Sequence, residues 1–384
     1  MIQRTLITAI SYFVVAVSLV RGFKTYPPCP PLIGDVTVNV PNIFPEGAEF
    51  APSNCKFYIG SLNNGSVVEY DPYTSVTEII DLPGVSHNSD YFVCGVDYSH
   101  ATGTIYISAS ARAPWWPSIG GNLHGPNRLF QYSPLTKSIL WEANIDPLLA
   151  QVEREVGTPY AGFQDSAEDK DGNAYFFGTF GNIIVKVDKT GKASKFYSPD
   201  PEKGDRSYGF GGAFVTKENV LVLADALSDG FVLFDLSGPT PSQPTFTTPT
   251  GHPANFNDVL ECDALIAPPR YRDSVALCSN VLDRDFSQHG IITVYTSPDN
   301  WKTSQYVGMI PTDYGQNPDV WSTAQLATSD RVYALSSSLP YDDGKFPETK
   351  STTLVDITDG VDRLVGKFAP VQGFSESGAR RDEL

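Results

Sequence analysis

Short apolar runs recur along this chain, separated by turns rich in Gly, Asn, Asp and Pro. Clear examples are residues 57–61, 104–108, 174–178, 220–225 and 331–335. Runs of this length, rich in β-branched and aromatic residues and bounded by turn formers, predict β-strands. Long tracts rich in Ala, Leu, Glu and Lys are missing, so the pattern predicts a mostly β protein.

The strand pattern also repeats at a larger scale. Each unit has a polar loop, a strand, a short turn, a second strand, another loop and two more strands, over about 50–70 residues. Six such units predict an all-β, six-bladed β-propeller over residues 36–368, because a four-stranded blade buries its faces only against neighbouring blades. Residues 35–40 predict a strand that completes the last blade. A pair of β-sandwiches is the alternative architecture.

One segment departs from the β pattern. Asp146 is an acidic cap, Pro147 occupies the first helical turn, and Gly157 is a typical closing residue. These signals predict one short helix inserted in the propeller.

Both ends of the chain carry possible sorting signals. Residues 1–22 resemble a secretory signal peptide, with Arg4 before an apolar stretch and cleavage expected after Ser18 or Gly22. The tail, residues 369–384, ends in Arg-Asp-Glu-Leu, which resembles an endoplasmic-reticulum retrieval sequence. We expect the lumen of the endoplasmic reticulum or a related vesicle as the location, with secretion as the alternative.

The charge balance restricts the possible partners. Forty-four acidic residues face 27 Lys and Arg, for a formal net charge of −17. Such a surface repels nucleic acid and anionic lipid, so we expect no nucleic-acid partner and no membrane insertion of the mature chain. The charge favours a soluble monomer, and small molecules are the expected partners.

The five cysteines allow two disulfides. Cys262 and Cys278 lie on either side of a predicted hairpin turn, so we expect them to form one disulfide. Cys29, Cys55 and Cys94 compete for a second, and spacing does not choose among them. Asn64 begins the Asn-Gly-Ser sequon and is the expected glycosylation site. No paired short spacing points to a metal site.

In a propeller, the loops that enter the innermost strands and those that follow the second strands converge on one face of the central channel. Such loops often carry function. The predicted face is rich in aromatic and reactive residues, namely Glu46, His87, Trp115, Trp116, His124, Phe163, Gln164, Asp165, Phe180, Tyr208, Asn257, Asp258 and Trp321. Each has a structural alternative: a carboxylate bonded to backbone amides, an Asx turn, a loop anchor or a solvated histidine.

Familiar catalytic motifs are missing from the sequence. It contains no Gly-x-Ser-x-Gly elbow, no His-Glu-x-x-His, no P-loop and no dinucleotide fingerprint after a strand. The sequence therefore carries no local signature of a familiar enzyme class.

Residues 44–50 (Phe-Pro-Glu-Gly-Ala-Glu-Phe), followed by Phe-Tyr-Ile-Gly-Ser-Leu-Asn at 57–63, carry a family resemblance. The chain resembles the fungal six-bladed propellers of natural-product clusters over residues 36–368. This group includes a trichothecene-cluster propeller protein and the hetero-Diels–Alderases of tropolone–sesquiterpenoid pathways. The wider superfamily is that of the gluconolactonase-like propellers.

The resemblance implies a cofactor-independent cyclase that joins a tropolone ortho-quinone methide to a humulene-type sesquiterpene. Tyr208, His124 or His87 would then donate a hydrogen bond to the diene oxygen, and Asp165 and Glu46 would act as acid and base.

The remaining residues of the predicted face would hold the substrates. These expected walls and contacts are Trp115, Trp116, Phe163, Gln164, Phe180, Asn257, Asp258 and Trp321. A metal-dependent lactonase, with Glu46 and Asp165 or Asn257 as ligands, is the first alternative. A non-catalytic secreted binding propeller is the second.

Overall fold

The structure is a computed structural model of the chain. It describes residues 26–115, 122–199, 208–238, 243–253, 262–280, 291–312, 320–338 and 346–368. The expected signal peptide, the tail, Trp116, Asn257 and Asp258 lie outside the described residues.

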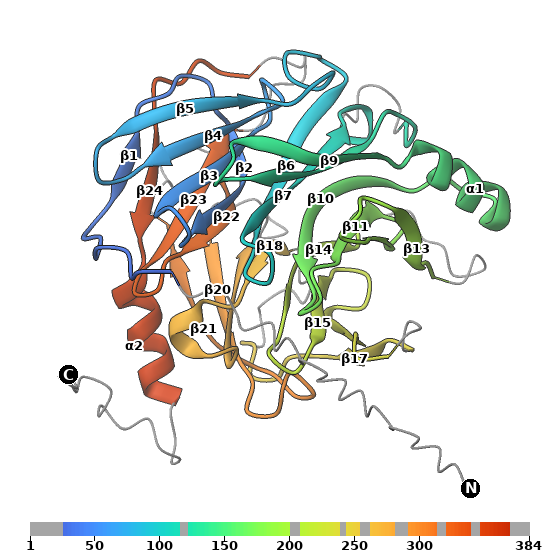
Figure 1. The fold of residues 1–384 in the computed structure, drawn as a ribbon. Coiled ribbons are helices and arrows are strands. Elements are labelled where there is room, and N and C mark those ends of the chain that lie inside the picture. Colours follow the sequence, from blue (N-terminus) through green and yellow to red (C-terminus); the bar gives the residue numbers. More distant parts are fainter. Residues whose placement is uncertain are drawn as a thin grey trace, which may run out of the picture.

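Six four-stranded antiparallel sheets surround a central axis, as Figure 1 shows. The first three blades follow one another along the chain. Blade 1 contains β2 (Pro45–Ala51), β3 (Lys56–Ser61), β4 (Ser66–Asp71) and β5 (Val76–Asp81). Blade 2 contains β6 (Tyr91–Ser99), β7 (Thr104–Ala111), β8 (Arg128–Ser133) and β9 (Ser138–Asn144). Blade 3 contains β10 (Ala161–Glu168), β11 (Ala174–Phe180), β12 (Ile183–Val187) and β13 (Ala193–Tyr197).

The remaining blades complete the ring and confirm the six-bladed propeller. Blade 4 contains β14 (Phe210–Val215), β15 (Val220–Asp225), β16 (Gly230–Asp235) and β17 (Thr245–Thr247). Blade 5 contains β18 (Cys262–Ile266), β19 (Val275–Asn280), β20 (Ile291–Thr296) and β21 (Gln305–Pro311). Blade 6 contains β22 (Val320–Ala327), β23 (Val332–Ser338), β24 (Thr352–Asp356) and β1 (Val36–Val38).

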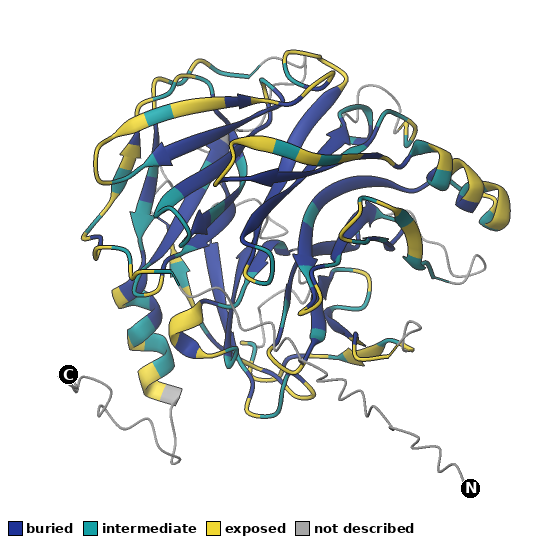
Figure 2. Ribbon diagram, in the orientation of Figure 1, coloured by how far each residue is buried: buried dark blue, intermediate teal, exposed yellow. Residues whose placement is uncertain are grey.

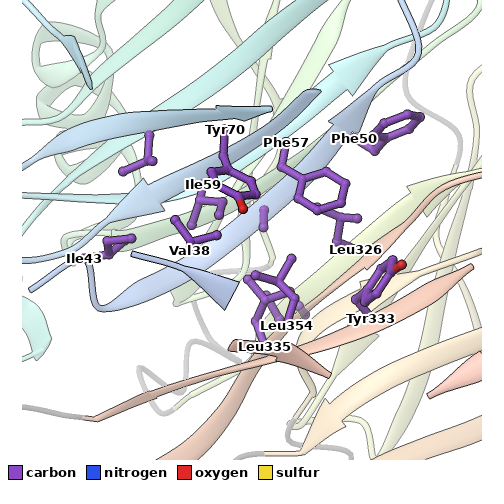
Figure 3. Packing of buried hydrophobic residues seen from close by; sticks show 14 of the residues in the cluster. Val38, Ile43, Phe50, Phe57, Ile59, Tyr70, Leu326, Tyr333, Leu335 and Leu354 are labelled. Carbon is purple, nitrogen blue, oxygen red and sulfur yellow. The ribbon is translucent and has the colours of Figure 1, made fainter. Parts of the chain in front are cut away.

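The expected closing strand is confirmed. β1 pairs antiparallel with β24, with Val36 opposite Leu354 and Val38 opposite Thr352. The outermost strand of the last blade therefore comes from the beginning of the propeller. Figure 3 shows the packing at this closure, where Val38 and Leu354 of blade 6 lie near Ile59 of blade 1.

One hydrophobic cluster lies between each pair of neighbouring blades, six in all within the described residues. Figure 2 shows that the inner strands are buried and the outermost strands are exposed. β3 is buried along nearly all of its length, whereas β5 is mostly exposed. Packing between blades therefore provides most of the buried apolar surface.

The helices agree only in part with the single helix predicted from the sequence. The predicted helix is α1 (Asp146–Val156), which ends at Gly157 in the left-handed conformation, with φ of 80°. The expectation of a single helix is wrong, because α2 (Thr358–Phe368) follows β24. Its buried Val361 and partly buried Leu364 pack into the cluster between blades 5 and 6.

Two short 3₁₀ turns, η1 (Ala113–Trp115) and η4 (Pro269–Tyr271), complete the helical elements used below. No helix among the described residues is both long enough and apolar enough to cross a membrane.

Two disulfides are present. The expected pair Cys262–Cys278 forms, although Cys262 lies opposite Asn280 and Cys278 lies opposite Leu265 in the paired strands. The open question of the second pair is resolved in favour of Cys29–Cys55, with Cα atoms 5.6 Å apart, and Cys94 is a buried free thiol. Two disulfides indicate folding in an oxidising compartment.

Removing the Cys29–Cys55 disulfide tests how far it holds the closing segment. The double variant Cys29→Ser/Cys55→Ser opens a link between residues separated by 26 positions. We expect a loss of about 3 kcal/mol in the free energy of unfolding, because the unfolded chain regains the freedom that the loop restricts. Denaturant unfolding followed by circular dichroism measures it, and an unchanged midpoint would contradict the prediction.

Candidate active site

Every inner strand contains a bulge at an equivalent position. The pairing of each inner strand with its neighbour shifts between Pro45 and Ala48 in β2, and the same kind of shift occurs in β6, β10, β14, β18 and β22. The first unpaired residues, which we call the bulge ring, are Glu46, Cys94, Gln164, Gly211, Asp263 and Thr323. β-Bulges commonly redirect side chains beside active sites.

Glycines allow the inner strands to approach one another at these bulges. A Cβ atom on Gly47 would lie 2.4 Å from the carbonyl oxygen of Cys94 in the next blade. One on Gly211 would lie 1.6 Å from the carbonyl oxygen of Cys262, and one on Gly212 would lie 1.8 Å from the backbone nitrogen of Leu265. Only glycine fits such contacts, so these residues set the width of the channel.

A hydrogen-bond network fixes Asp263 in the bulge ring. The side-chain amide of Gln164 donates to Asp263 Oδ1 at 3.2 Å and to its backbone oxygen at 2.9 Å. The Tyr208 hydroxyl donates to the same Oδ1 at 3.3 Å. Thr179 donates to the Gln164 side-chain oxygen at 3.1 Å, which orients the amide. Of the residues predicted for the site, Tyr208 and Gln164 are thus joined through a carboxylate that the sequence analysis did not select.

Glu46 is the second carboxyl at this level. Its Oε2 atom is buried and has no hydrogen-bond partner among the described residues. Burial raises the pKa of Glu46 well above its usual range, and the nearby Asp263 charge raises it further. Burial also raises the pKa of Asp263 to about 7, while the hydrogen bonds from Tyr208 and Gln164 oppose that rise. The better-bonded Asp263 is therefore the member of the pair that ionises more easily.

Further carboxyls lie along the channel toward the ends of the inner strands. Burial raises the pKa of Asp97 to about 6, and it raises the pKa values of Glu49, Asp165 and Glu168 well above normal. Asp97 and Glu168 share a hydrogen bond, and Glu168 also accepts one from the backbone N–H of His100 at 3.1 Å.

Many of these residues surround one small cavity of about 40 Å³ in the channel. Its carboxyl lining consists of Glu46, Glu49, Asp97, Asp165 and Asp263, and no Lys or Arg contributes. The described residues contain no group of three or more His, Cys, Asp or Glu arranged to hold a metal ion. The cavity has room for a few water molecules and is too small for a larger organic ligand.

An aromatic collar lies above the bulge ring, at the end where the inner strands begin. We define it as Phe44, Phe92, Trp115, Phe180 and Phe346. Phe44 and Phe346 have ring centroids 4.4 Å apart, and Trp115 and Phe180 have centroids 5.1 Å apart. Phe44, Phe92, Trp115 and Phe346 belong to one cluster with Cys94 of the bulge ring.

The collar also carries polar groups. The Arg112 guanidinium lies 5.0 Å from the centre of the Phe92 ring. The Trp115 Nε1 atom is buried without a hydrogen-bond partner in the part of the chain that the structure describes. An indole N–H in this state is available to a ligand oxygen. Trp115 and Phe180, both expected as walls, are thus brought together at this end of the channel.

The two predicted histidines do not line the cavity. His87 and His124 have side chains that are 67% and 64% exposed, and they pair with Asp81 at 3.3 Å and Glu153 at 3.1 Å. The structure therefore offers no support for either as the hydrogen-bond donor, and Tyr208 is the member of the predicted trio that contacts channel residues.

Two predicted wall residues are placed differently. Phe163 is fully buried in the core between blades 2 and 3, so its expected role as a substrate wall is wrong. Phe163 precedes the bulge of β10, and at that position its ring points into the interface between blades 2 and 3. The backbone of Trp321 lies in β22 opposite Ser337, and its side chain is outside the described residues.

The sequence analysis missed Asp263, Asp97, Glu49 and Glu168. Each lies inside an inner strand, whereas the residues predicted from the sequence were those expected in loops. A signal existed, because acidic residues in otherwise apolar strands are costly to bury and suggest a lined cavity. Glu46 and Asp165 were predicted, but they also lie within strands rather than in the loops that precede them.

Comparison with known proteins agrees with this architecture. A family described as Mal s 1 allergenic protein-like matches residues 25–285. The chain belongs to this family. "Trichothecene biosynthesis protein 14" of Trichoderma arundinaceum is 27% identical over 354 residues, covering 88% of this chain and 92% of the relative. "Core trichothecene cluster (CTC) protein 14" of Fusarium sporotrichioides is 24% identical, covering 90% of each chain.

Among solved structures, the major Malassezia sympodialis allergen Mala s 1 superposes with a TM-score of 0.69 at 20% identity. The match covers 85% of this chain and 96% of that structure, and it supports the fold alone. The expected resemblance to the trichothecene-cluster propeller protein is confirmed.

Filling the space at a bulge tests the role of the glycines. Gly212→Ala places a methyl group against the backbone of Leu265, where no flexible side chain can move away. We expect loss of the cooperative folding transition. The matched control is Gly366→Ala in α2, where nothing lies within 4 Å of the added atom; it should stabilise the protein by about 0.5–1 kcal/mol. Equal melting temperatures for the two variants would contradict this account.

The raised carboxyl pKa values predict an unusual pH dependence of stability. Between the unfolded values, near 4, and the folded values of about 6 for Asp97 and about 7 for Asp263, the folded state binds more protons. Stability should therefore be fully present below that window and fall as pH rises through it. Thermal unfolding from pH 5 to pH 8 measures this slope.

Asp263→Asn should flatten the slope, because the amide does not titrate. The exposed Glu218→Gln serves as the matched control and should leave it unchanged. An Asp263→Asn variant with the wild-type slope would exclude Asp263 as its source.

Proposed function

We propose that this protein is a cofactor-independent cyclase of secondary metabolism. In its most specific form, it joins a tropolone ortho-quinone methide to a humulene-type sesquiterpene as a hetero-Diels–Alderase. The similarity to proteins of trichothecene biosynthesis supports the broader role. The specific reaction rests on the resemblance described above and on the chemistry of the channel.

One observation carries the proposal: an aromatic collar lies next to a ring that holds two coupled carboxyls. Flat and apolar molecules bind well between aromatic side chains, and the pair Glu46–Asp263 offers an acid beside a base. The cavity between the carboxyls is too small for a terpene, so the organic substrates would occupy the collar. Only a hydroxyl group would reach down to the pair.

The pair suits the loss of water from a benzylic-type alcohol beside an acidic ring hydroxyl. The protonated Glu46 would give its proton to the alcohol oxygen as the C–O bond breaks and water leaves. The Asp263 carboxylate would take the proton of the ring hydroxyl. The organic product is the neutral quinone methide, and one proton transfer from Asp263 to Glu46 restores the starting state.

Ring closure itself needs no proton. The diene and the alkene would form one C–C and one C–O bond while stacked in the collar, which lowers the entropic cost of bringing them together. The indole N–H of Trp115 is the candidate donor for the carbonyl oxygen of the diene, and the Tyr208 hydroxyl would serve instead only by giving up its hydrogen bond to Asp263.

Two other functions remain as outcomes of the experiment. A metal-dependent lactonase would use the same carboxylates, including Glu46 and Asp165, as calcium ligands. A binding propeller would hold the ligand in the collar without changing it. We further propose that the protein acts in the lumen of the endoplasmic reticulum or a related vesicle, in line with its two disulfides.

Chiral product analysis tests the proposed reaction. The purified mature protein is given a tropolone quinone-methide precursor and humulene, with and without EDTA. We expect one enantiomer of the adduct and no effect of EDTA. Only the racemic background product would overturn the cycloaddition for this pair, and hydrolysis of lactones on addition of calcium would support the lactonase instead.

Substitutions of the pair test the mechanism. Glu46→Gln and Asp263→Asn remove the acid and the base while preserving side-chain size, so each should lower kcat by about 10²–10⁴-fold. Glu218→Gln, which is exposed in the turn between β14 and β15 and does not line the cavity, is the control with expected wild-type kcat. Full activity of both channel variants would exclude the acid–base role.

A further inference from the structure

The cavity below Glu46 and Asp263 has unsatisfied oxygen atoms on several sides. Glu46 Oε2, Asp97 Oδ2, Ser166 Oγ and Gln325 Oε1 are buried and have no partner among the described residues. All four residues line the cavity, and they come from blades 1, 2, 3 and 6. Ser166 and Gln325 are 2% and 1% exposed, so bulk water does not reach them.

The unpaired atoms indicate what the cavity contains. Gln325 Oε1 only accepts hydrogen bonds, and Glu46 Oε2 and Asp97 Oδ2 only accept them when their carboxyls are ionised. No Lys or Arg lines the cavity to donate to these atoms. Buried polar atoms without partners are costly, so an occupant that donates hydrogen bonds is required. A cavity of about 40 Å³ accepts a few water molecules.

A second carboxyl pair reaches the same cavity through Asp97, which lines it, whereas its partner Glu168 is not one of the lining residues. Asp97 and Glu168 are hydrogen-bonded to each other, which requires that one of them carries a proton. The titratable groups that face this pair are Glu49, Asp165, Tyr98, Tyr106 and His100. None of these is a fixed positive charge, so nothing in the described surroundings neutralises two ionised carboxylates.

We propose that the cavity is a proton-sharing site, in which water molecules connect Glu46 and Asp263 with Asp97, and through Asp97 with Glu168. The lower pair stores a proton and passes it through the waters to the upper pair. Over one cycle the lower pair passes a proton through the waters to Glu46 and takes one back from Asp263, so at each pair one O–H bond breaks and one forms, and no further reactant is needed. The storage itself is independent of the proposed function, whereas its use to reload Glu46 rests on that function.

Infrared spectroscopy detects the stored proton directly. Protonated carboxyls give a C=O band apart from that of carboxylates, and its size is followed from pH 5 to pH 9 on the full-length mature protein. We expect the wild type to keep such a band at pH 7. Asp97→Asn and Glu168→Gln should each remove a part of it, while the surface control Glu218→Gln should not.

A connection through water predicts coupling between the pairs. Asp263→Asn removes the carboxylate of the upper pair, so the protonated carboxyls that remain should lose their protons at lower pH, because less negative charge faces them. Absence of a protonated carboxyl band at pH 7 in the wild type would overturn the proposal. So would removal of the band by one equivalent of calcium, which would identify the cavity as a cation site.

A kinetic experiment tests the use of the stored proton. With Glu168→Gln, the first turnover should keep the wild-type rate, whereas later turnovers should slow several-fold, since reloading is impaired. Equal slowing of both would indicate a structural defect and overturn the reloading role. The infrared result does not depend on turnover, so failure of the cyclase reaction and failure of proton storage are distinguishable.

Discussion

Closure of the blade ring is the constraint on which the rest of this structure depends. A four-stranded blade has two apolar faces and only its neighbours can cover them, so all six hydrophobic clusters are in place only when the ring is complete. The last gap is closed by β1, which joins β24 across more than 300 residues of chain. The Cys29–Cys55 disulfide and the hydrogen bond from Arg331 to the backbone of Leu32 hold the segment that contains β1 against blades 1 and 6.

Closure also explains why so many carboxyls share one small space. Six inner strands meet at the axis, and their bulges turn successive side chains toward it. Glycines at 47, 211 and 212 allow the backbones to come close enough for these side chains to interact. Repulsion and desolvation then keep protons on groups that would otherwise be ionised. The raised pKa values of these carboxyls predict a cost in stability near neutral pH, as is common where residues are arranged for function.

The channel therefore has two chemically distinct levels. Aromatic rings dominate the collar, where an apolar substrate gains by leaving water, and oxygen atoms dominate the cavity below it, where protons and water are favoured. Asp263 lies at the boundary between the two levels and is oriented by Gln164 and Tyr208. A substrate with an apolar body and one hydroxyl group fits such a boundary.

The sequence by itself determined the number of blades, the closing strand, α1 and the Cys262–Cys278 disulfide. These features depend on short-range patterns: alternation within strands, turn formers between them, a helix cap, and a hairpin. It also indicated Glu46, Gln164, Asp165 and Tyr208, which lie close to where inner strands begin. Helix α2 carries a comparable local signal, the apolar residues at positions 361, 364 and 365, but it was not predicted from the sequence.

Only the tertiary structure decided which side chains meet. Glu46 and Asp263 are more than 200 positions apart, and Asp97 reaches Glu168 only because blades 2 and 3 are neighbours in the ring. The same holds for the exposure of His87 and His124, which lie in loops, and for the burial of Phe163, which lies before the bulge of β10 and packs between blades 2 and 3. Pattern along a chain specifies strands, whereas the bulge positions and the closure of the ring specify the site.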